Sequence, residues 1–339
     1  MCSAIFQTDI GASSGGQAQK MMTGLAPIPM HPAYRSGSAT PWGGSGLREY
    51  FGKDIPDECT GEALECSCIP GLNSTDDRGT PLSSLISTLG ERLTGTAVKG
   101  EFPLLLKLLC AKDRLSVQVH PDDAYAREHE NKLGKTEAWI ILYAEEGASI
   151  VYGVKEGTTR EQLREASEKG KEIEQLLRHV PVRAGEVYYI PAGTVHAIGS
   201  GIVLYEIQQS SDVTYRFYDW DRTDSQGRKR QLHTRDAVAV TDVTLSGLAA
   251  VPVELGPGRC RLLKNEHFTV ERWDSRTGVI KKDLRRFRIL TALGETRLSW
   301  EGGSMQLTAG QTVLIPADTA ELTVSTVQLL LSMPSAEDD

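Results

Sequence analysis

A chain of 339 residues is long enough for one large domain or two ordinary ones. Its 40% hydrophobic and 24% charged residues are typical of a soluble globular protein. The net charge of −8 and the pI near 5.5 argue against nucleic acid or an anionic membrane surface as the main partner. A small anionic substrate stays compatible with this charge, because it needs only a local cluster of basic side chains.

The cysteine pattern and the absence of long apolar runs indicate the compartment. The six cysteines form no CxxC pair and no disulfide framework in a chain of this length. No apolar run reaches the ~18 residues needed to span a membrane, and the N-terminus lacks a basic segment followed by an apolar core. We therefore expect a cytoplasmic protein whose cysteines are reduced, small packing residues.

The first hundred residues predict a leader, an arm and one helix. Residues 1–24 are rich in Ser, Gly, Gln and Ala, which predicts a disordered leader. Residues 25–46 contain four prolines and end in a Trp-Gly-Gly turn, which is typical of an extended arm. From Leu82 to Leu93, after Pro81, leucine and isoleucine recur every three or four residues, so we expect an amphipathic helix that ends near Gly95.

The central part of the chain alternates predicted strands and short helices. Residues 102–110 are a leucine run with a single lysine, which favours a buried strand. Residues 121–129 begin with proline and predict a short helix, and residues 138–143 predict a strand. Thr158 and Glu161 have the spacing of a capping box, so a second helix should begin there as an excursion from a β core.

Further β segments follow. Residues 186–190 and 201–208 predict strands, residues 215–220 are rich in Tyr, Phe and Trp, and residues 234–240 favour a short helix. From Cys260 onward, short β-prone segments alternate with glycine turns, which indicates a second all-β unit.

One internal repeat supports a duplicated architecture. AGEVYYIPA at 184–192 is echoed by AGQTVLIPA at 309–317, 125 residues later, in similar β-rich surroundings. We therefore expect a mainly β fold of two β-barrel units with a few helices. The N-terminal domain should cover residues 25–245, and the C-terminal domain residues 246–339 with a disordered tail. No histidine follows Ala317 at the end of the second copy, so that unit should bind no metal.

Four side chains form a candidate metal site in the first unit. Gln118 and His120 are two residues apart in an apolar alternation, so on a strand both would project from one face. Glu137 can add a carboxylate, and a strand that ends in a Pro-Ala-Gly turn presents His196. A single histidine in a strand is more often a packing residue, but this mixed nitrogen and oxygen set suits zinc.

Five motifs carry a resemblance to a known family. They resemble the type I mannose-6-phosphate isomerases in their short bacterial form, and weaker similarity extends from Trp42 to about Ala317. The motifs are FPLL at 102–105, LSVQVHPDD at 115–123, GKTE at 134–137, YIPAGTVHAI at 189–198 and YEIQQSSDVTYRFYDWDR at 205–222. The resemblance implies a bicupin, a pair of jelly-roll-like β-barrels, with one catalytic zinc per chain. It carries the ligand roles to Gln118, His120, Glu137 and His196.

The resemblance also implies the reaction and its catalytic residues. Members of the family interconvert mannose 6-phosphate and fructose 6-phosphate, which requires proton movement between C1 and C2 through an enediol. The position of Arg216 is catalytic, and those of Lys135 and Glu206 lie beside the substrate. Arg216 would stabilise the enediolate with a permanent charge. Burial could raise the pKa of Glu206 and suit it to act as a base, but a role as the partner of Arg216 is equally compatible.

Two other classes of protein remain open from the residues. Two histidines and a carboxylate also form the facial triad of an Fe(II) cupin dioxygenase, although Gln118 and the cations Lys135 and Arg216 have no explanation there. A non-catalytic sugar-phosphate-binding cupin is the second alternative, against which the complete ligand set and Arg216 argue. The expected partner is a small sugar phosphate, and the sequence indicates neither its phosphate-binding residues nor the oligomeric state.

Overall fold

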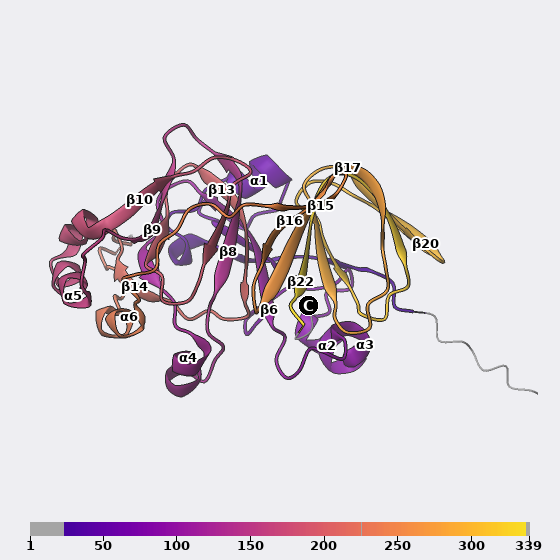
Figure 1. Ribbon diagram of the computed structural model, residues 1–339, viewed down its shortest axis with the longest axis horizontal. Helices are drawn as coiled ribbons and strands as arrows, with labels where there is room; N and C mark the ends of the chain where they lie inside the picture. The colour runs from indigo at the N-terminus through magenta and orange to yellow at the C-terminus, as the bar shows by residue number, and fades with distance from the viewer. Residues whose placement is uncertain (1–23, 225, 337–339) are drawn as a thin grey trace, which may run out of the picture.

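The computed structural model describes residues 24–224 and 226–336. Within these ranges the chain is mainly β and consists of two sheet-built halves side by side, the N-terminal half on the left of Figure 1 and the C-terminal half on the right. This confirms the predicted fold class. Apart from Gly24, the predicted leader lies outside the described residues, as does the tail at 337–339.

Two sheets that face one another build the N-terminal half. One has five strands in the order β10 (Leu177–Pro181), β9 (Ser149–Val154), β12 (His196–Ile198), β7 (Val117–Val119) and β14 (Tyr215–Tyr218). The other has six strands in the order β11 (Val187–Ile190), β8 (Glu137–Ala144), β13 (Ile202–Gln209), β6 (Leu104–Ala111), β3 (Glu62–Cys66) and β2 (Ala33–Arg35). A small hairpin joins β4 (Cys68–Ile69) to β5 (Leu72–Asn73). The strands predicted at 138–143, 186–190 and 201–208 are confirmed as β8, β11 and β13.

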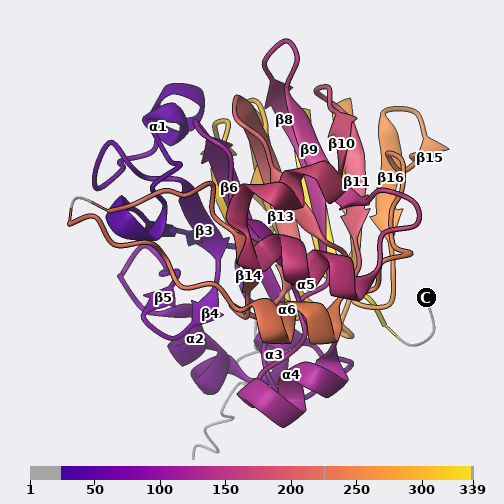
Figure 2. The same ribbon diagram turned by 90° about the vertical axis from the view of Figure 1, so that its left-hand side faces the viewer.

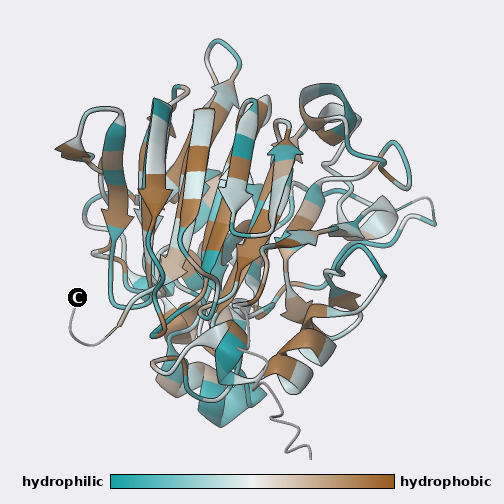
Figure 3. Cartoon of the chain, turned by 90° about the vertical axis from the view of Figure 1, so that its right-hand side faces the viewer, coloured by the Kyte–Doolittle hydropathy of each residue, from teal (hydrophilic) through white to brown (hydrophobic). Residues whose placement is uncertain are grey.

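A single nine-stranded sheet builds the C-terminal half. Its main path is β1 (Ile28–Met30), β21 (Thr312–Ile315), β18 (Arg288–Ala292), β22 (Leu322–Pro334), β17 (Phe268–Ile280), β16 (Arg259–Lys264) and β15 (Val253–Gly256). The hairpin of β19 (Thr296–Trp300) and β20 (Gly303–Leu307) joins through β22. Figure 3 shows hydrophobic and hydrophilic bands alternating along strands of this half. That alternation follows from the two-residue period of a strand, which presents successive side chains to opposite faces.

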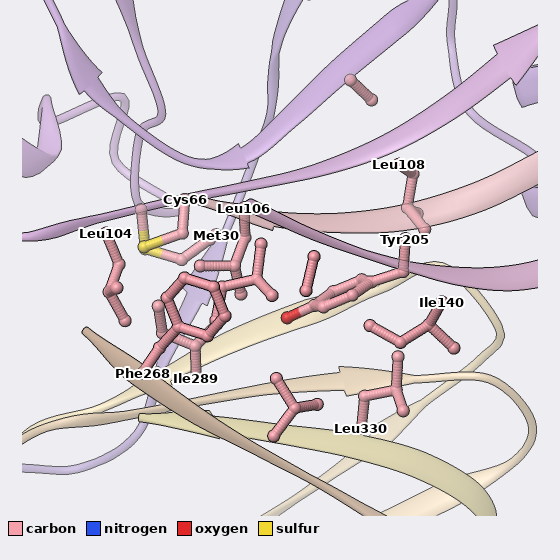
Figure 4. Close-up of a cluster of buried hydrophobic side chains, with 14 of the residues drawn as sticks. Met30, Cys66, Leu104, Leu106, Leu108, Ile140, Tyr205, Phe268, Ile289 and Leu330 are labelled. Atoms are coloured by element: carbon pink, nitrogen blue, oxygen red, sulfur yellow. The ribbon is translucent and has the colours of Figure 1, made fainter. Parts of the chain in front are cut away.

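The two halves meet along the six-stranded sheet. On β6, the side chains of Leu104, Leu106 and Leu108 belong to a core that also contains Phe268 and Leu330 of the C-terminal sheet, and Figure 4 shows the two groups facing each other. Alternate residues of β6 point the other way, toward the five-stranded sheet. Because both of its faces are covered, β6 is buried throughout, which explains the nearly continuous leucine run in the sequence.

The predicted N-terminal arm takes part in the C-terminal sheet. β1 pairs antiparallel with β21, which is the second copy of the repeat. The next strand, β2, pairs with β3 in the N-terminal half. A strand from the start of the chain therefore crosses to the C-terminal half, and the domain division at residue 245 stays a prediction.

The helices lie outside the sheets. They are α1 (Gly46–Phe51), α2 (Leu82–Leu89), α3 (Glu91–Thr94), α4 (Asp123–Glu130), α5 (Arg160–Glu168) and α6 (Thr234–Val240), with 3-10 turns at Gly37–Ala39 and Gly170–Leu176. Figure 2 shows α5 and α6 in front of the five-stranded sheet. Among the described helices, none has the length and apolar character needed to cross a membrane.

Two helix predictions need correction. The helix expected from Leu82 to Leu93 is broken into α2 and α3 at Gly90, whose φ of +51° leaves the helical region. The capping box of α5 is formed by Thr159 and Gln162, one residue later than predicted. Thr158, the predicted cap, instead donates its backbone N–H to the carbonyl of Lys155 and belongs to the preceding turn.

Candidate active site

Three polar side chains lie side by side on the five-stranded sheet. Gln118 of β7 pairs with His196 of β12 on one side and with Arg216 of β14 on the other. Residues directly opposite each other on adjacent strands project from the same face. The fold therefore brings together an imidazole, an amide and a guanidinium from segments almost 100 residues apart in the chain.

The remaining predicted ligands approach this row from the ends of neighbouring strands. His120 follows β7, and Glu137 is the first residue of β8 in the facing sheet. His120 Nε2 lies 3.6 Å from Glu137 Oε2, and His196 Nε2 lies 3.4 Å from Glu137 Oε1. All three side chains are about 1% exposed. The predicted histidines and glutamate thus form one buried cluster.

This cluster has the donor chemistry of a metal site. Its ligand atoms all lie within 4.8 Å of one another, and Glu137 Oε1 is buried without a hydrogen-bond partner. Burial lowers the pKa of His196 to about 3 and that of His120 well below its usual range, so both imidazoles are neutral, as metal ligands must be. The amide of Gln118 lies 3.4 Å from His196 Nε2, and a rotation of this amide would present its oxygen to the cluster.

Lys135 lies inside the cluster. Its Nζ is 2.8 Å from His120 Nε2 and donates to Glu137 Oε2 at 2.7 Å. Two of the candidate ligand atoms, His120 Nε2 and Glu137 Oε2, therefore both contact the Lys135 ammonium. The arrangement fits a position of high affinity for positive charge, and it fits the zinc that the ligand set suggested.

Two glycines of the motifs are required by backbone geometry. A Cβ on Gly134 would lie 2.5 Å from the backbone of Asp122 and Asp123, so only glycine lets the GKTE segment pass beside the loop after β7. Gly193 has φ of +88° in the turn that precedes His196, a conformation that favours glycine. Both glycines position ligands without contributing chemistry of their own.

The pKa of Glu206 differs from the predicted one. Burial by itself would raise the pKa of this carboxyl, but the adjacent Lys107 and Lys135 outweigh burial and lower it to about 2. Its Oε1 accepts from Lys107 Nζ at 2.8 Å, and its Oε2 accepts from Trp139 Nε1 at 3.2 Å. The prediction of a raised pKa is therefore wrong, and the partner of Glu206 is Lys107, not Arg216.

Lys107 is a site residue that the sequence reasoning missed. It pairs with Glu206 across β6 and β13, and its Nζ also lies 3.7 Å from Glu62 Oε2. Burial lowers the pKa of Lys107, but the two carboxylates reverse this effect and raise it, so the ammonium stays charged. The sequence did contain an indication of this residue, because a lysine in a wholly buried leucine strand needs a charged partner.

Arg216 has no carboxylate partner among the described residues. Burial lowers the pKa of its guanidinium, nearby Arg230 and Arg35 act in the same direction, and its Nε is buried without a hydrogen bond. The backbone N–H of Arg216 donates to His233 Nδ1 at 3.2 Å, which ties β14 to the segment before α6. A half-buried guanidinium without a carboxylate partner is suited to an anionic ligand.

A cleft between the two N-terminal sheets joins these groups. It encloses about 560 Å³, including the part open to solvent, and Gln118, Lys135, Glu206 and Arg216 all line it. Five basic and three acidic side chains line this cleft, so it is positive in a chain whose net charge is −8. Asp212, which also lines it, accepts from Lys132 Nζ at 2.5 Å.

Comparison with known proteins identifies relatives of this chain. The family model described as the catalytic domain of type I phosphomannose isomerase matches residues 34–168. A mannose-6-phosphate isomerase of Streptococcus mutans is 42% identical over 81% of this chain and 88% of its own length. A second relative, mannose-6-phosphate isomerase ManA of Bacillus subtilis, is 45% identical over 60% of this chain and 64% of its own length.

Solved structures agree with the fold. The mannose 6-phosphate isomerase structure from Bacillus subtilis superposes with a TM-score of 0.83 at 35% identity, covering 91% of this chain and 99% of that one. A zinc-bound mannose 6-phosphate isomerase superposes with a TM-score of 0.73 at 18% identity, over 92% of this chain and 100% of that one. Because of the close relative from Streptococcus mutans and the matching catalytic-domain model, this chain belongs to the type I mannose-6-phosphate isomerase family.

Proposed function

We propose that this protein is a zinc-dependent isomerase that interconverts mannose 6-phosphate and fructose 6-phosphate through an enediol. The observation that carries the proposal is the buried cluster of His120, Glu137 and His196. Lys135, which contacts His120 and Glu137, also lines the adjoining cleft together with Arg216. The reaction removes a proton from C2 of the aldose and returns one to C1, while a hydroxyl proton moves from O2 to O1. Negative charge therefore develops on the two oxygens.

The metal site supports one zinc ion per chain. His120, Glu137 and His196 would hold it, with the amide oxygen of Gln118 as the fourth ligand. When bound, zinc polarises or orients sugar oxygens as a Lewis acid without redox chemistry. The neutral state of both imidazoles and the unpaired Oε1 of Glu137 support this assignment.

Arg216 and Lys135 supply positive charge to the reacting oxygens. Arg216 cannot lose its proton near neutral pH, so it stabilises the enediolate and does not act as a base. Its lack of an internal carboxylate partner leaves the guanidinium available for this role. Lys135 lies among the ligand atoms. From this position its ammonium can donate a hydrogen bond to a sugar oxygen or exchange a proton with that oxygen.

Glu206 acts through Lys107. Its two oxygens are both engaged, so the carboxylate orients the Lys107 ammonium at the wall of the cleft. A carboxyl with a pKa of about 2 is a weak base. Lys107, which this pair keeps protonated, would donate a hydrogen bond to the substrate.

A coupled assay tests the reaction. The purified protein should convert mannose 6-phosphate to fructose 6-phosphate, lose this activity with a chelator and regain it with zinc. Elemental analysis should find about one zinc per chain. His120→Ala and His196→Ala should each lose the metal and the activity, whereas the control His179→Ala, which changes an exposed histidine of β10, should keep both.

Other outcomes would identify the competing classes. Iron in place of zinc, with oxygen consumption, would indicate the dioxygenase. Tight binding of mannose 6-phosphate without turnover by zinc-loaded protein would indicate the non-catalytic cupin. Two metal ions per chain would contradict the single-site assignment.

A further inference from the structure

Basic groups are concentrated at the end of the cleft away from the ligand cluster. Arg35 and Arg230 line it together with Arg216, although they come from opposite ends of the N-terminal half. The segment around Ala39 links them: Arg230 Nη1 donates to the carbonyl of Ala39, and Thr40 donates to the carbonyl of Arg35 at 3.0 Å. Three guanidinium groups therefore line one cavity beyond the proposed zinc ligands.

Strand order sets the direction of the cleft. On the five-stranded sheet, His196, Gln118 and Arg216 follow one another across β12, β7 and β14, so His196 and Arg216 are two strand spacings, or about 10 Å, apart. On the facing sheet, Glu206 lies opposite Lys107, and further along the sheet Arg35 lies opposite Glu62. On both sheets, the order of the strands thus leads from candidate metal ligands toward an arginine.

Arg230 is held in place by a carboxylate but retains donors. Its Nε and Nη2 donate to Asp219 at 2.7 and 2.6 Å, and Nη1 makes a longer contact of 3.4 Å with Ala39. A guanidinium has five N–H donors, so this geometry leaves further donors on the two Nη atoms. Asp219 also pairs with Arg222, so this one carboxylate faces two arginines and the group keeps a net positive charge.

Arg35 is less engaged than Arg230. Its nearest carboxylate is Glu62, at 3.8 Å, and no described residue accepts a hydrogen bond from its guanidinium. Glu62 Oε2 is itself shared with Lys107 at 3.7 Å. The side chain of Arg35 is 28% exposed, so it can reach both the cleft and solvent.

We infer that Arg35 and Arg230 bind the phosphate group of the sugar phosphate, with Asp219 positioning Arg230. The inference rests on the proposed function for the identity of the sugar, but the anion site is defined by the arginines alone. Arginine presents paired donors that match phosphate oxygens. A phosphate at this end leaves the opposite end of the sugar, with C1 and C2, directed toward Arg216 and the metal ligands.

Kinetics of two variants test the assignment. Arg35→Gln and Arg230→Gln should each raise KM for mannose 6-phosphate by about 10- to 100-fold, the scale of a lost charge-assisted hydrogen bond, with kcat changed by less than about threefold. The inhibition constant of inorganic phosphate should rise in parallel, and Arg35→Lys should restore part of the affinity. Zinc content should match that of the wild-type protein. Arg230→Gln also loses two hydrogen bonds to Asp219, so the thermal midpoint of each variant is measured and the kinetics are taken well below it.

Matched controls come from exposed arginines outside the cleft. Arg228→Gln changes an exposed arginine two residues before Arg230 that pairs with Asp224 instead. Arg48→Gln changes an exposed arginine that pairs with Glu58. Neither residue lines the cleft, so both variants should keep the wild-type KM and the wild-type inhibition by phosphate.

The outcomes separate this inference from the proposed reaction. Binding of inorganic phosphate, measured by calorimetry on zinc-loaded protein, does not depend on turnover. If the wild-type protein lacks isomerase activity but binds phosphate through Arg35 and Arg230, the proposed reaction is contradicted and the proposed phosphate site is supported. If the protein is active but the variants bind phosphate normally, or lose kcat at an unchanged KM, the phosphate site is wrong. Failure of the wild-type protein to bind phosphate at millimolar concentration would also overturn it.

Discussion

Lys107 and Glu206 form a buried ion pair across two adjacent strands at the wall of the cleft. Each side chain is 5% exposed, and the Nζ to Oε1 distance is 2.8 Å. Removing such charges from water is costly, so a buried ion pair often contributes little net stability. The proposed function gives the pair a role, because it keeps the Lys107 ammonium charged at a fixed place in the cleft beside the candidate metal ligands.

Replacing Arg216 should affect the chemical step. Arg216→Ala should lower kcat by roughly two to three orders of magnitude, the scale of removing one preorganised donor from a developing oxyanion. Arg216→Lys should recover only part of this loss, because an ammonium lacks the planar fork of a guanidinium. The measurement is steady-state kinetics with zinc content determined on the same samples, which should be unchanged. An increase in KM alone, with kcat intact, would instead make Arg216 a phosphate ligand.

The pKa of Glu206 leads to a pH-dependent difference in stability. Because its folded-state pKa is about 2, below the ordinary value of 4.5, the ionised carboxyl stabilises the folded state above about pH 4.5. That contribution is lost as the pH falls through about 2. Glu206→Gln should cost about 3 kcal/mol at pH 7, where it leaves Lys107 with only the more distant Glu62. The cost should shrink between pH 4.5 and 2.

Urea unfolding at pH 7 and near pH 3 measures this difference. Glu101→Gln is the control, because Glu101 pairs with Arg127 at an exposed position and should change stability by less than about 0.5 kcal/mol. A cost for Glu206→Gln that is the same at pH 7 and near pH 3 would show that the Glu206 carboxyl is not an ion-pair partner in the folded state.

At the scale of single elements, α5 shows how local chemistry sets a boundary. The Thr159 side chain accepts from the backbone N–H of Gln162, and the Gln162 side chain accepts from the backbone N–H of Thr159. Glu161, the partner expected from the earlier register, instead pairs with Arg164 on the exposed face. The sequence contains two overlapping capping patterns, Thr158 with Glu161 and Thr159 with Gln162. Because Thr158 belongs to the preceding turn, the second pattern caps the helix.

Substitutions on α5 distinguish the two registers. Thr159→Ala should lower the free energy of unfolding by about 1 kcal/mol, because it leaves a helix N-terminal N–H without its cap. Glu161→Ala should cost only a few tenths of a kcal/mol, the usual contribution of an exposed helical ion pair. Both variants should keep the isomerase activity, since α5 lies outside the sheets that hold the ligands. A larger cost for Glu161→Ala would contradict the observed cap.

At the scale of the whole molecule, the six-stranded sheet belongs to both halves. Its outer face packs on the C-terminal sheet in one continuous apolar cluster, and the hydroxyls of Tyr205 and Ser332 hydrogen-bond across this interface at 2.8 Å. β1 further joins the halves by pairing with β21. The strands that present Lys107 and Glu206 to the cleft are therefore supported from behind by the C-terminal half.

A cavity in this interface should destabilise the whole chain. Leu330→Ala, at a residue that is 0% exposed, should cost about 2–5 kcal/mol, and both halves should unfold in one transition. Val327→Ala on the same strand is the control, because Val327 is 58% exposed and should change stability by about 0.5 kcal/mol or less. Unfolding followed by both circular dichroism and tryptophan fluorescence tests this, and separate transitions would contradict the shared core.

Local patterns in the sequence were sufficient for several elements. The apolar run of β6, the capping pattern before α5 and the internal repeat predicted a mainly β fold with helices outside it. Gln118 and His120 could be placed on one face because strand geometry is local. Their meeting with Glu137 and His196 was expected from the resemblance of these motifs to the type I mannose-6-phosphate isomerases.

Tertiary structure alone decided which charges face one another. The sequence by itself placed Glu206 in an apolar strand, and burial then suggested a raised pKa, but the carboxylate lies opposite Lys107, 99 residues earlier, and the pKa is lowered. The convergence of Arg35 and Arg230 on the cleft likewise depends on long-range strand order. Hydrophobic periodicity reports which face of an element is buried, whereas the sign of an electrostatic effect depends on the partner across the fold, which no local pattern specifies.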